Sequence, residues 1–248
     1  MSTINTMRTI LITGAANGLG AAFLAHYQTQ PNTSILAVDR LPITATHPNI
    51  RTFIADLSSE QSILNLTTQL TSQPIDLLIH SAGIRGLVPS AEDAHPDNVQ
   101  ACETLEVMDL ATITRTLQIN AVGTFALLRS LLPNLRASQS GAKVILMSSR
   151  MGSIGNNEVP NKDAGSAYAY RASKAALNML VRSLAVDVPE VVFVLCHPGR
   201  VETKLVRCVE EGAISAGESV EGLLPLIERW GKADSGRFYD RFGEVIQW

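Results

Sequence analysis

The sequence predicts an α/β fold: a single-domain, doubly wound parallel sheet with helices on both faces. Short apolar runs alternate with longer amphipathic stretches along all 248 residues, which is the pattern of parallel strands joined by crossover helices. Most apolar runs are continuous, as strands are when both faces of a parallel sheet are covered. No repeat or linker divides the chain, so residues 1–248 are expected to form one domain.

The apolar runs give the strands, about seven in number, and the stretches between them give the helices. In the last of these stretches Val220, Leu223, Leu224 and Ile227 fall on one helical face. The predicted strands are Thr9–Ile12, Ile35–Val38, Ile50–Ile54, Ile75–Ile79, Val144–Met147, Val191–Cys196 and Gly236–Tyr239. The predicted helices are Leu19–Tyr27, Ser59–Leu70, Thr112–Leu132, Tyr168–Val186 and Ser219–Arg229.

The composition narrows the range of partners and locations. Lys plus Arg number 20 and Asp plus Glu 23, a net charge of −3, whereas a nucleic-acid binder usually shows a clustered basic excess. No apolar run approaches the roughly 20 residues of a membrane helix, and the first residues do not resemble a secretory signal. Cys102, Cys196 and Cys208 are widely separated, so we expect free thiols in a cytoplasmic protein. The histidines are also scattered, and no metal site is expected.

A glycine-rich turn, Thr13–Gly20, follows the first predicted strand and leads directly into the first helix. Its glycines are Gly14, Gly18 and Gly20. Glycine permits a tight turn and removes the Cβ that would block a pyrophosphate, while the helix amino end offers N–H groups to phosphate oxygens. The spacing G-x3-G-x-G differs from the standard fingerprint, but its position between strand and helix predicts a dinucleotide site.

Two acidic residues follow the next strands. Asp39 ends the second strand, where a carboxylate accepts hydrogen bonds from ribose hydroxyls and repels a 2′-phosphate, which favours NAD. Arg40 follows it and offers a bidentate partner to a 2′-phosphate, so NADP stays open. Asp56, after the third strand, has two roles open to it: a hydrogen bond to the adenine or a cap on the next helix.

Tyr170 and Lys174 form the candidate acid/base pair. They are four residues apart in a predicted helix, so their side chains share a face. A tyrosine with a pKa of about 10 is a poor base at neutral pH. A nearby ammonium favours the phenolate and lowers that pKa. The pair therefore suits the proton transfer that accompanies carbonyl reduction or alcohol oxidation.

Two further polar positions strengthen this interpretation. A predicted strand ends in Ser148 and Ser149, where a hydroxyl can orient a substrate oxygen toward the tyrosine. Asn120 lies inside an apolar helix, and a buried amide needs partners. Those partners are either a water in a proton relay or a hydrogen bond between helices.

With these motifs in place, the sequence resembles the short-chain dehydrogenase/reductase family along essentially its whole length. The glycine motif of that family matches Thr13–Gly20, and its Asn–Ser–Tyr–Lys tetrad falls on Asn120, Ser149, Tyr170 and Lys174. Its Asn-Asn-Ala-Gly element and its Pro-Gly turn correspond to His80–Gly83 and Pro198–Gly199. Within the family, the sequence is most similar to the C-factor and sniffer-type carbonyl reductase subgroup. The segments that carry this similarity are Met147–Ile154, Tyr168–Lys174 and Ser235–Trp248.

The resemblance implies a Rossmann-type fold and a role for each matched residue. Tyr170 would be the general acid/base, Ser149 would polarise the substrate oxygen, and Asn120 would anchor a relay water. Lys174 would bind the nicotinamide ribose and lower the pKa of the tyrosine. The expected contacts of an NAD cofactor, with NADP as the alternative, are Gly14, Asn17, Gly18, Leu19, Gly20, Asp39, Arg40, Asp56, Leu57, Ser81, Ala82, Gly83, Tyr170, Lys174, Pro198, Gly199, Val201 and Thr203.

The sequence departs from its relatives at several cofactor and substrate positions. Asn17 stands where NADP-preferring relatives often carry a basic residue, which supports NAD. Arg200 and Lys204 stand where the subgroup often has Trp and an acid, so no substrate is carried over. The segments expected to line a substrate pocket are the surface loops Pro89–Asn98 and Gly152–Gly165, and the stretch Arg200–Gly217.

Two functions are carried forward from the sequence. The first is an NAD(P)-dependent oxidoreductase that transfers a hydride between a nicotinamide and a small carbonyl or alcohol substrate. The second is a dinucleotide-binding, C-factor-like signalling or scaffold protein in which turnover is incidental. By resemblance we expect a homodimer or homotetramer that pairs helices Thr112–Leu132 and Tyr168–Val186, with no nucleic-acid or membrane partner.

Overall fold

Seven parallel strands form one sheet in the order β3-β2-β1-β4-β5-β6-β7 in the computed structural model, which describes residues 7–159, 161 and 165–248. The predicted fold class is therefore confirmed, and the strand ends differ from the predicted ones by at most two residues. The strands are β1 (Arg8–Thr13), β2 (Thr33–Asp39), β3 (Ile50–Ile54), β4 (Leu77–His80), β5 (Lys143–Met147), β6 (Val192–His197) and β7 (Arg237–Asp240).

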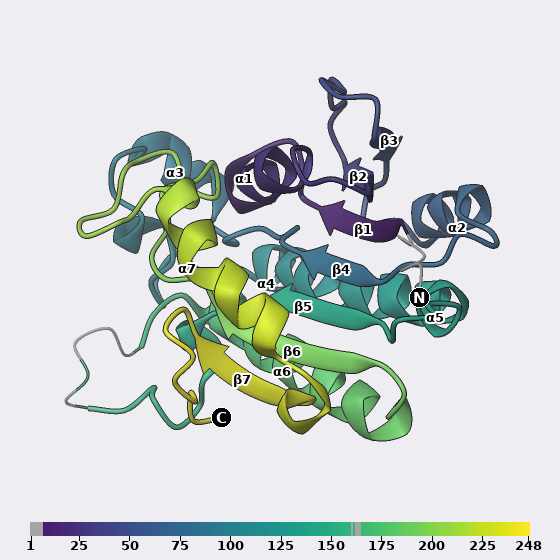
Figure 1. Cartoon of the computed structure of the whole chain (residues 1–248). Coiled ribbons are helices and arrows are strands. Elements are labelled where there is room, and N and C mark those ends of the chain that lie inside the picture. The colour runs from purple at the N-terminus through teal and green to yellow at the C-terminus, as the bar shows by residue number, and fades with distance from the viewer. Residues whose placement is uncertain (1–6, 160, 162–164) are drawn as a thin grey trace, which may run out of the picture.

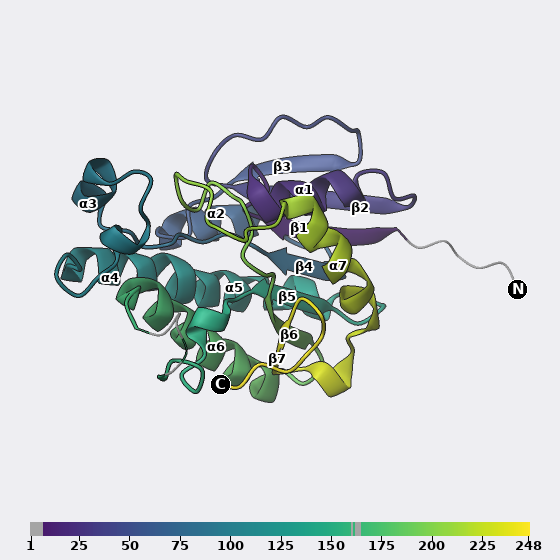
Figure 2. The ribbon, with the colours of Figure 1, turned by 90° about the vertical axis from the view of Figure 1, so that its left-hand side faces the viewer.

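The helices cover both faces of this sheet (Figure 1). They are α1 (Gly18–Tyr27), α2 (Glu60–Gln69), α3 (Pro89–Ala94), α4 (Leu110–Leu117), α5 (Thr124–Arg136), α6 (Tyr168–Asp187) and α7 (Ala216–Arg229). In the turned view, α4, α5 and α6 lie together on one side of the sheet and α1 and α7 on the other (Figure 2). None of the helices in the described ranges has the length and apolarity that a membrane crossing requires.

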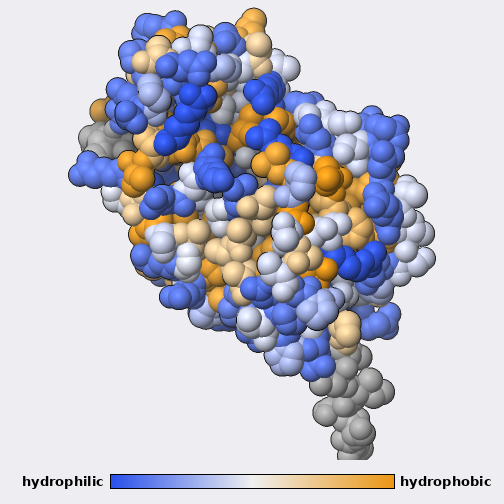
Figure 3. Space-filling view, turned by 90° about the horizontal axis from the view of Figure 1, so that it is seen from above, coloured by the Kyte–Doolittle hydropathy of each residue, from blue (hydrophilic) through white to orange (hydrophobic). Residues whose placement is uncertain are grey.

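The core has two layers because alternate strand residues point to opposite faces of the sheet. In β1, Leu11 packs into the layer that also holds Leu127 of α5 and Val181 of α6. Its neighbours Ile10 and Ile12 pack into the other layer, with Phe23 of α1 and Leu223 of α7. Seen from above, apolar side chains gather toward the middle of the visible face and hydrophilic ones along its rim (Figure 3).

The strand order reverses at β1, which lies between β2 and β4. The chain runs outward from β1 to β3 in one direction and from β4 to β7 in the other. Such a reversal separates the crossover connections and opens a crevice at the carboxyl ends of the central strands. The glycine turn and the ends of β4, β5 and β6 border this crevice.

The predicted helix Thr112–Leu132 is wrong as a single helix. The structure divides it into α4, a π-helical stretch over Gln118–Gly123, and α5. A π turn holds one residue more than an α turn, and the periodicity of the sequence hides this insertion. The π-helical stretch carries Asn120, whose side chain bonds to residues outside the helix.

The predicted loop Pro89–Asn98 is also partly wrong, since its first residues form α3. Proline usually ends a helix. At the first position of a helix, however, its missing N–H has no hydrogen bond to make, and its fixed φ suits the helix. The other predicted loop, Gly152–Gly165, lies partly outside the described residues. Its residues between 153 and 159 form turns and no strand or helix.

Candidate active site

A half-open cleft of about 390 Å³ lies at the carboxyl ends of the central strands. Every residue predicted to contact the cofactor lines this cleft, and so does Ser149. Residues that the sequence did not single out also line it, among them Arg115 and Ile119 of α4 and its continuation. Nothing in their sequence marks them, because only the folding of the chain brings α4 and its continuation to the cleft.

The glycine turn is packed tightly against the loop after β4. Gly14 has a φ of +68°, and a Cβ there would lie 2.9 Å from the backbone nitrogen of Ala82. A Cβ on Gly20 would lie 2.1 Å from the carbonyl oxygen of Gly14. The hydroxyl of Ser81 donates to the carbonyl of Thr13 at 2.7 Å, which joins the two loops. The backbone thus forms a cradle that only glycine leaves open at these positions.

The start of α1 faces the same cleft. Asn17 is the N-cap residue, but its side chain accepts no hydrogen bond from the first turn. The N–H groups of that turn therefore have no side-chain cap, and their partial positive charge is directed toward the cleft. This end of the helix can accept the phosphate groups of a dinucleotide.

Asp39, at the end of β2, and Asp56, after β3, both line the cleft. The carboxylate of Asp39 accepts from the backbone N–H groups of Ala16 and Leu41, both at 3.0 Å. The carboxylate of Asp56 accepts from the N–H and hydroxyl of Ser58, both at 2.8 Å, and these bonds lower its pKa. The role of helix cap predicted as one alternative for Asp56 is wrong, since Ser59 caps α2 instead.

Tyr170 and Lys174 share the buried face of α6 and line the cleft. The Lys174 Nζ lies 5.6 Å from the centroid of the Tyr170 ring. The same ammonium donates to the carbonyl oxygen of Met147 at 2.8 Å, at the end of β5. Burial lowers the pKa of Lys174 to about 8.

The two serines at the end of β5 have different partners. The Ser148 hydroxyl donates to Asn178 Oδ1 at 2.6 Å, so this hydroxyl joins the end of β5 to α6. The Ser149 oxygen accepts from the backbone N–H of Met151 at 3.2 Å, so its O–H can donate to a different partner. A hydrogen bond from Ser149 also lowers the pKa of Tyr170.

The net pKa shift of Tyr170 is opposite to the sequence prediction. Burial raises the pKa of the phenol and outweighs the effects that lower it, which come from the Arg85 guanidinium and the Ser149 hydrogen bond. The sequence could not show this, because Tyr170 becomes buried only when α6 packs onto the sheet. Arg85 was not among the site residues predicted from the sequence.

Asn120 lies beneath the cleft and does not line it. Its Oδ1 accepts from the N–H of Ile84 at 2.8 Å, and its Nδ2 donates to the carbonyl of Ile84 and to the Ser173 hydroxyl. The side-chain amide thus ties the loop after β4 to α6. The bond to Ser173 on α6 matches the second alternative weighed from the sequence, a hydrogen bond between helices, and the relay water stays a prediction.

Two of the scattered histidines lie at or near the cleft. His80 is buried at the end of β4, and its Nδ1 and Nε2 each lie 2.9 Å from a threonine hydroxyl, those of Thr13 and Thr124. Burial and the Lys174 charge lower the pKa of His80 to about 3. His197 lines the cleft before the Pro-Gly turn, and its Nδ1 has no hydrogen-bond partner within the described ranges.

Of the three segments expected to line a substrate pocket, only Arg200–Gly217 contributes described residues to the cleft, including Thr203 and Lys204. The segment Pro89–Asn98 does not line the cleft, but its helix α3 contacts the segment that does. Arg207 of the Arg200–Gly217 segment forms ion pairs with Glu92 at 3.4 Å and Asp93 at 2.9 Å. These pairs join a segment that lines the cleft to α3, which does not line it.

A glycine cradle and a buried Tyr–Lys pair at the strand-order reversal of a parallel sheet define a dinucleotide-binding α/β protein. The chain belongs to the short-chain dehydrogenase/reductase family, since the family profile described as short chain dehydrogenase matches residues 8–213. The predicted nicotinamide cofactor and oxidoreductase class are in line with this membership.

Named relatives and solved structures agree with this assignment. The C-signal protein of Myxococcus xanthus is 39% identical over 185 residues, which cover 73% of this chain and 97% of the relative. Short chain dehydrogenase gsfK of Penicillium aethiopicum is 31% identical over 268 residues, covering 97% and 99%. The NADPH-bound carbonyl reductase from chicken fatty liver superposes with a TM-score of 0.81 at 28% identity, covering 98% of this chain and 100% of that one.

Proposed function

We propose that this chain is an NAD(P)-dependent oxidoreductase that interconverts a carbonyl and an alcohol, with Tyr170 as the general acid/base. The observation that carries the proposal is the convergence of Ser149, Tyr170 and Lys174 on the cleft that the glycine turn borders. A signalling protein that only binds a dinucleotide has no need for these three groups at one place.

The residues of the cleft fit a nicotinamide dinucleotide. The glycine turn and the start of α1 would hold the pyrophosphate, Asp39 the adenosine ribose, and Lys174 the nicotinamide ribose. When bound, the nicotinamide supplies or accepts the hydride. The transfer of the proton and the orientation of the substrate oxygen are carried out by side chains of the protein.

Tyr170 carries the proton in this proposal. In reduction its O–H donates to the substrate oxygen as the carbonyl carbon gains a hydride, and in oxidation the phenolate removes the hydroxyl proton. The O–H of Ser149 donates to the same substrate oxygen and holds it beside the phenol. Lys174 provides a positive charge 5.6 Å from the ring centroid that favours the phenolate.

A steady-state assay with a panel of aldehydes, ketones and their alcohols tests the proposal. We expect saturable, cofactor-dependent turnover of at least one pair, followed by the absorbance of the reduced nicotinamide. Absence of turnover across the panel, with a cofactor bound in a parallel titration, would contradict the enzymatic function and favour the signalling alternative. The similarity to the C-signal protein is the observation that keeps that alternative in view.

Replacing Gly14 by alanine is expected to weaken dinucleotide binding by about tenfold or more, because its Cβ would push the glycine turn away from Ala82. Gly141→Ala is the matched control. Gly141 also has a positive φ, +82°, but nothing lies within 4 Å of its added Cβ. Nicotinamide fluorescence titration measures both variants. Equal loss of affinity in both would show that backbone strain, and not the cradle, is responsible.

The Asp39 carboxylate is expected to make NADH bind more tightly than NADPH. Asp39→Asn keeps an acceptor oxygen for one backbone N–H group and removes the charge that repels a 2′-phosphate. We expect the ratio of NADPH to NADH affinity to rise about tenfold in this variant. Arg40→Gln, at the next position, is expected to shift the ratio the other way. Tighter NADPH binding by the unaltered protein would overturn the role given to Asp39.

A further inference from the structure

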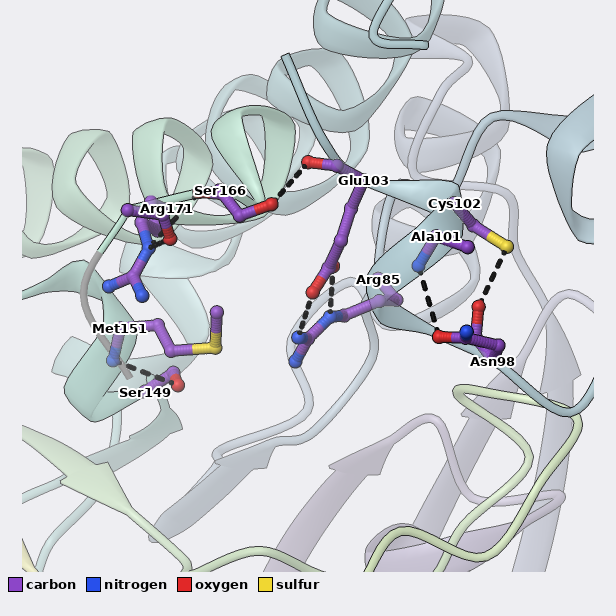
Figure 4. Close-up of polar contacts among 10 residues, drawn as sticks. Arg85, Asn98, Ala101, Cys102, Glu103, Ser149, Met151, Ser166 and Arg171 are labelled. Carbon is purple, nitrogen blue, oxygen red and sulfur yellow. Dashed lines mark hydrogen bonds and ion pairs between the residues drawn. The ribbon is translucent and has the colours of Figure 1, made fainter. Parts of the chain in front are cut away.

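A buried ion pair lies beside Tyr170 and has no part in the function proposed so far. Arg85, in the loop after β4, donates from Nε and from an Nη to the two carboxylate oxygens of Glu103, both at 2.8 Å (Figure 4). The side chains of Arg85 and Glu103 are only 11% and 5% exposed. Such a fork-to-fork geometry fixes the guanidinium plane as well as its position.

The guanidinium fixed in this way lies over the catalytic ring. Its central carbon is 4.9 Å from the centroid of the Tyr170 ring, within the range of a cation–π contact. Lys174 Nζ is farther from the same centroid, at 5.6 Å. Of these two cations, Arg85 is therefore the closer to the phenol ring, although only Lys174 belongs to the sequence motif.

Glu103 also holds the start of the helix that carries the phenol. Its backbone carbonyl accepts from the Ser166 hydroxyl at 3.0 Å (Figure 4). The same carbonyl accepts from the Ala167 N–H at 2.9 Å. Ser166 and Ala167 have φ values of +52° and +50°, a left-handed conformation that costs free energy without glycine. These bonds stabilise the turn from which α6 begins at Tyr168. One residue thus contacts both the arginine and the helix entry.

We propose that Arg85 is a positioning residue for Tyr170, holding the phenol ring by a cation–π contact, and that Glu103 fixes Arg85 and the start of α6 in one arrangement. The inference rests on the function proposed for Tyr170 and adds residues outside the family tetrad to it. Arg85 and Glu103 are 18 positions apart and meet only in the folded chain.

The charges of the two residues have opposite effects on the phenol. The Arg85 guanidinium lowers the pKa of Tyr170 more than the Glu103 carboxylate raises it. Removing the carboxylate charge alone is therefore expected to lower the pKa of Tyr170, whereas removing both charges is expected to raise it. A residue pair that served only to keep the fold intact would not give shifts of opposite sign.

Two variants separate these effects. Glu103→Gln keeps the backbone contacts to Ser166 and Ala167 and leaves Arg85 charged, with the amide oxygen still able to accept a hydrogen bond from the guanidinium. The double variant Arg85→Gln/Glu103→Gln removes the cation without leaving an unpaired buried carboxylate, which would endanger folding. Arg51→Gln is the matched control, because Arg51 lies 5.2 Å from the ring centroid of Phe53 on β3, a cation–ring pair that does not line the cleft.

The first measurement is the pH profile of alcohol oxidation, whose acidic limb reports deprotonation of the phenol. We expect this limb to move to lower pH in Glu103→Gln and to higher pH in the double variant, where kcat at neutral pH falls about tenfold. KM and cofactor affinity should change little in either variant. Arg85→Lys, which keeps the charge and loses the fork, is expected to recover part of the lost kcat.

The second measurement needs no turnover. The Tyr170 ring Cζ resonance, assigned by its loss in Tyr170→Phe, is followed by carbon NMR as the pH is raised. Its titration should begin at lower pH in Glu103→Gln and at higher pH in the double variant than in the unaltered protein. Shifts of the same sign in both variants would overturn the inference. Opposite shifts without turnover on any substrate would uphold the positioning role and refute the enzymatic function.

Discussion

Tyr170→Phe is expected to lower kcat by about 10²–10⁴-fold while leaving cofactor affinity nearly unchanged. The substitution removes the hydroxyl that donates and accepts the proton and keeps the ring that contacts Arg85 and Lys174. The ring is buried, and phenylalanine fills the same space, so the fold should persist. Steady-state turnover and nicotinamide fluorescence titration provide the two readouts.

Tyr168→Phe is the matched control for that variant. Tyr168 begins the same helix but is 40% exposed and does not line the cleft. We expect it to retain turnover. If Tyr170→Phe turned over at the rate of the control, Tyr170 would not be the acid/base. If a strain carrying Tyr170→Phe kept the cellular phenotype of the unaltered protein, the signalling function would gain support over the enzymatic one.

Lys174→Met is expected to combine a large loss of turnover with a gain in stability. Turnover should fall about 10²-fold or more, because the phenol loses a neighbouring cation and the nicotinamide ribose loses a donor. Burial lowers the pKa of Lys174 to about 8, so the folded protein binds the proton less well than the unfolded chain. At neutral pH the buried ammonium is therefore destabilising, on the order of 1–3 kcal/mol.

The pH dependence gives the sign of this effect. Below pH 8 the lysine is protonated in both states, and the full cost of its burial is present. Between about 8 and 10.4 the unfolded chain binds more protons, so the free energy of unfolding of the unaltered protein rises with pH. The stability advantage of Lys174→Met, measured by denaturant titration, should shrink over this interval. An advantage that stayed constant with pH would contradict a buried ammonium.

Lys143→Met serves as the control for the lysine prediction. The Lys143 ammonium donates to the carbonyl of Ile227 near the end of α7, outside the cleft. Its replacement removes a partner of a helix carbonyl and should leave turnover unchanged. Burial also lowers the pKa of Lys143, so unchanged turnover, and not the sign of the stability change, is what separates this variant from Lys174→Met.

The sequence predicted the sheet well because most of the strands contain a continuous apolar run. β6, for example, is buried along nearly its whole length, and its run of Val, Phe and Leu is unbroken. The glycine turn was predictable for a similar reason, since its function requires particular residues at adjacent positions. Features that depend on local sequence alone could thus be inferred with few errors.

The features that were missed depend on contacts between distant segments. The pairing of Arg85 with Glu103 leaves no periodic signal, and the burial that raises the pKa of Tyr170 arises only from packing. The π-helical stretch around Asn120 holds one residue more than an α-helical turn, and the apolar pattern of the sequence does not reveal this extra residue. The start of α3 at Pro89 was missed because proline both ends and begins helices.

The contacts of His80 fix the direction of a chain of hydrogen bonds. The Thr124 hydroxyl donates to the carbonyl of Asn120, so it must accept from His80, and the ring is the Nε2–H tautomer. Nδ1 then accepts from the Thr13 hydroxyl, whose oxygen accepts from the N–H of Ala82. All four donors therefore point the same way, from the loop after β4 through Thr13 and His80 to the π-helical stretch. A second ring proton, on Nδ1, would make that nitrogen a donor, and the Thr13 hydroxyl could no longer donate to it. The direction of the chain of hydrogen bonds therefore requires His80 to stay neutral.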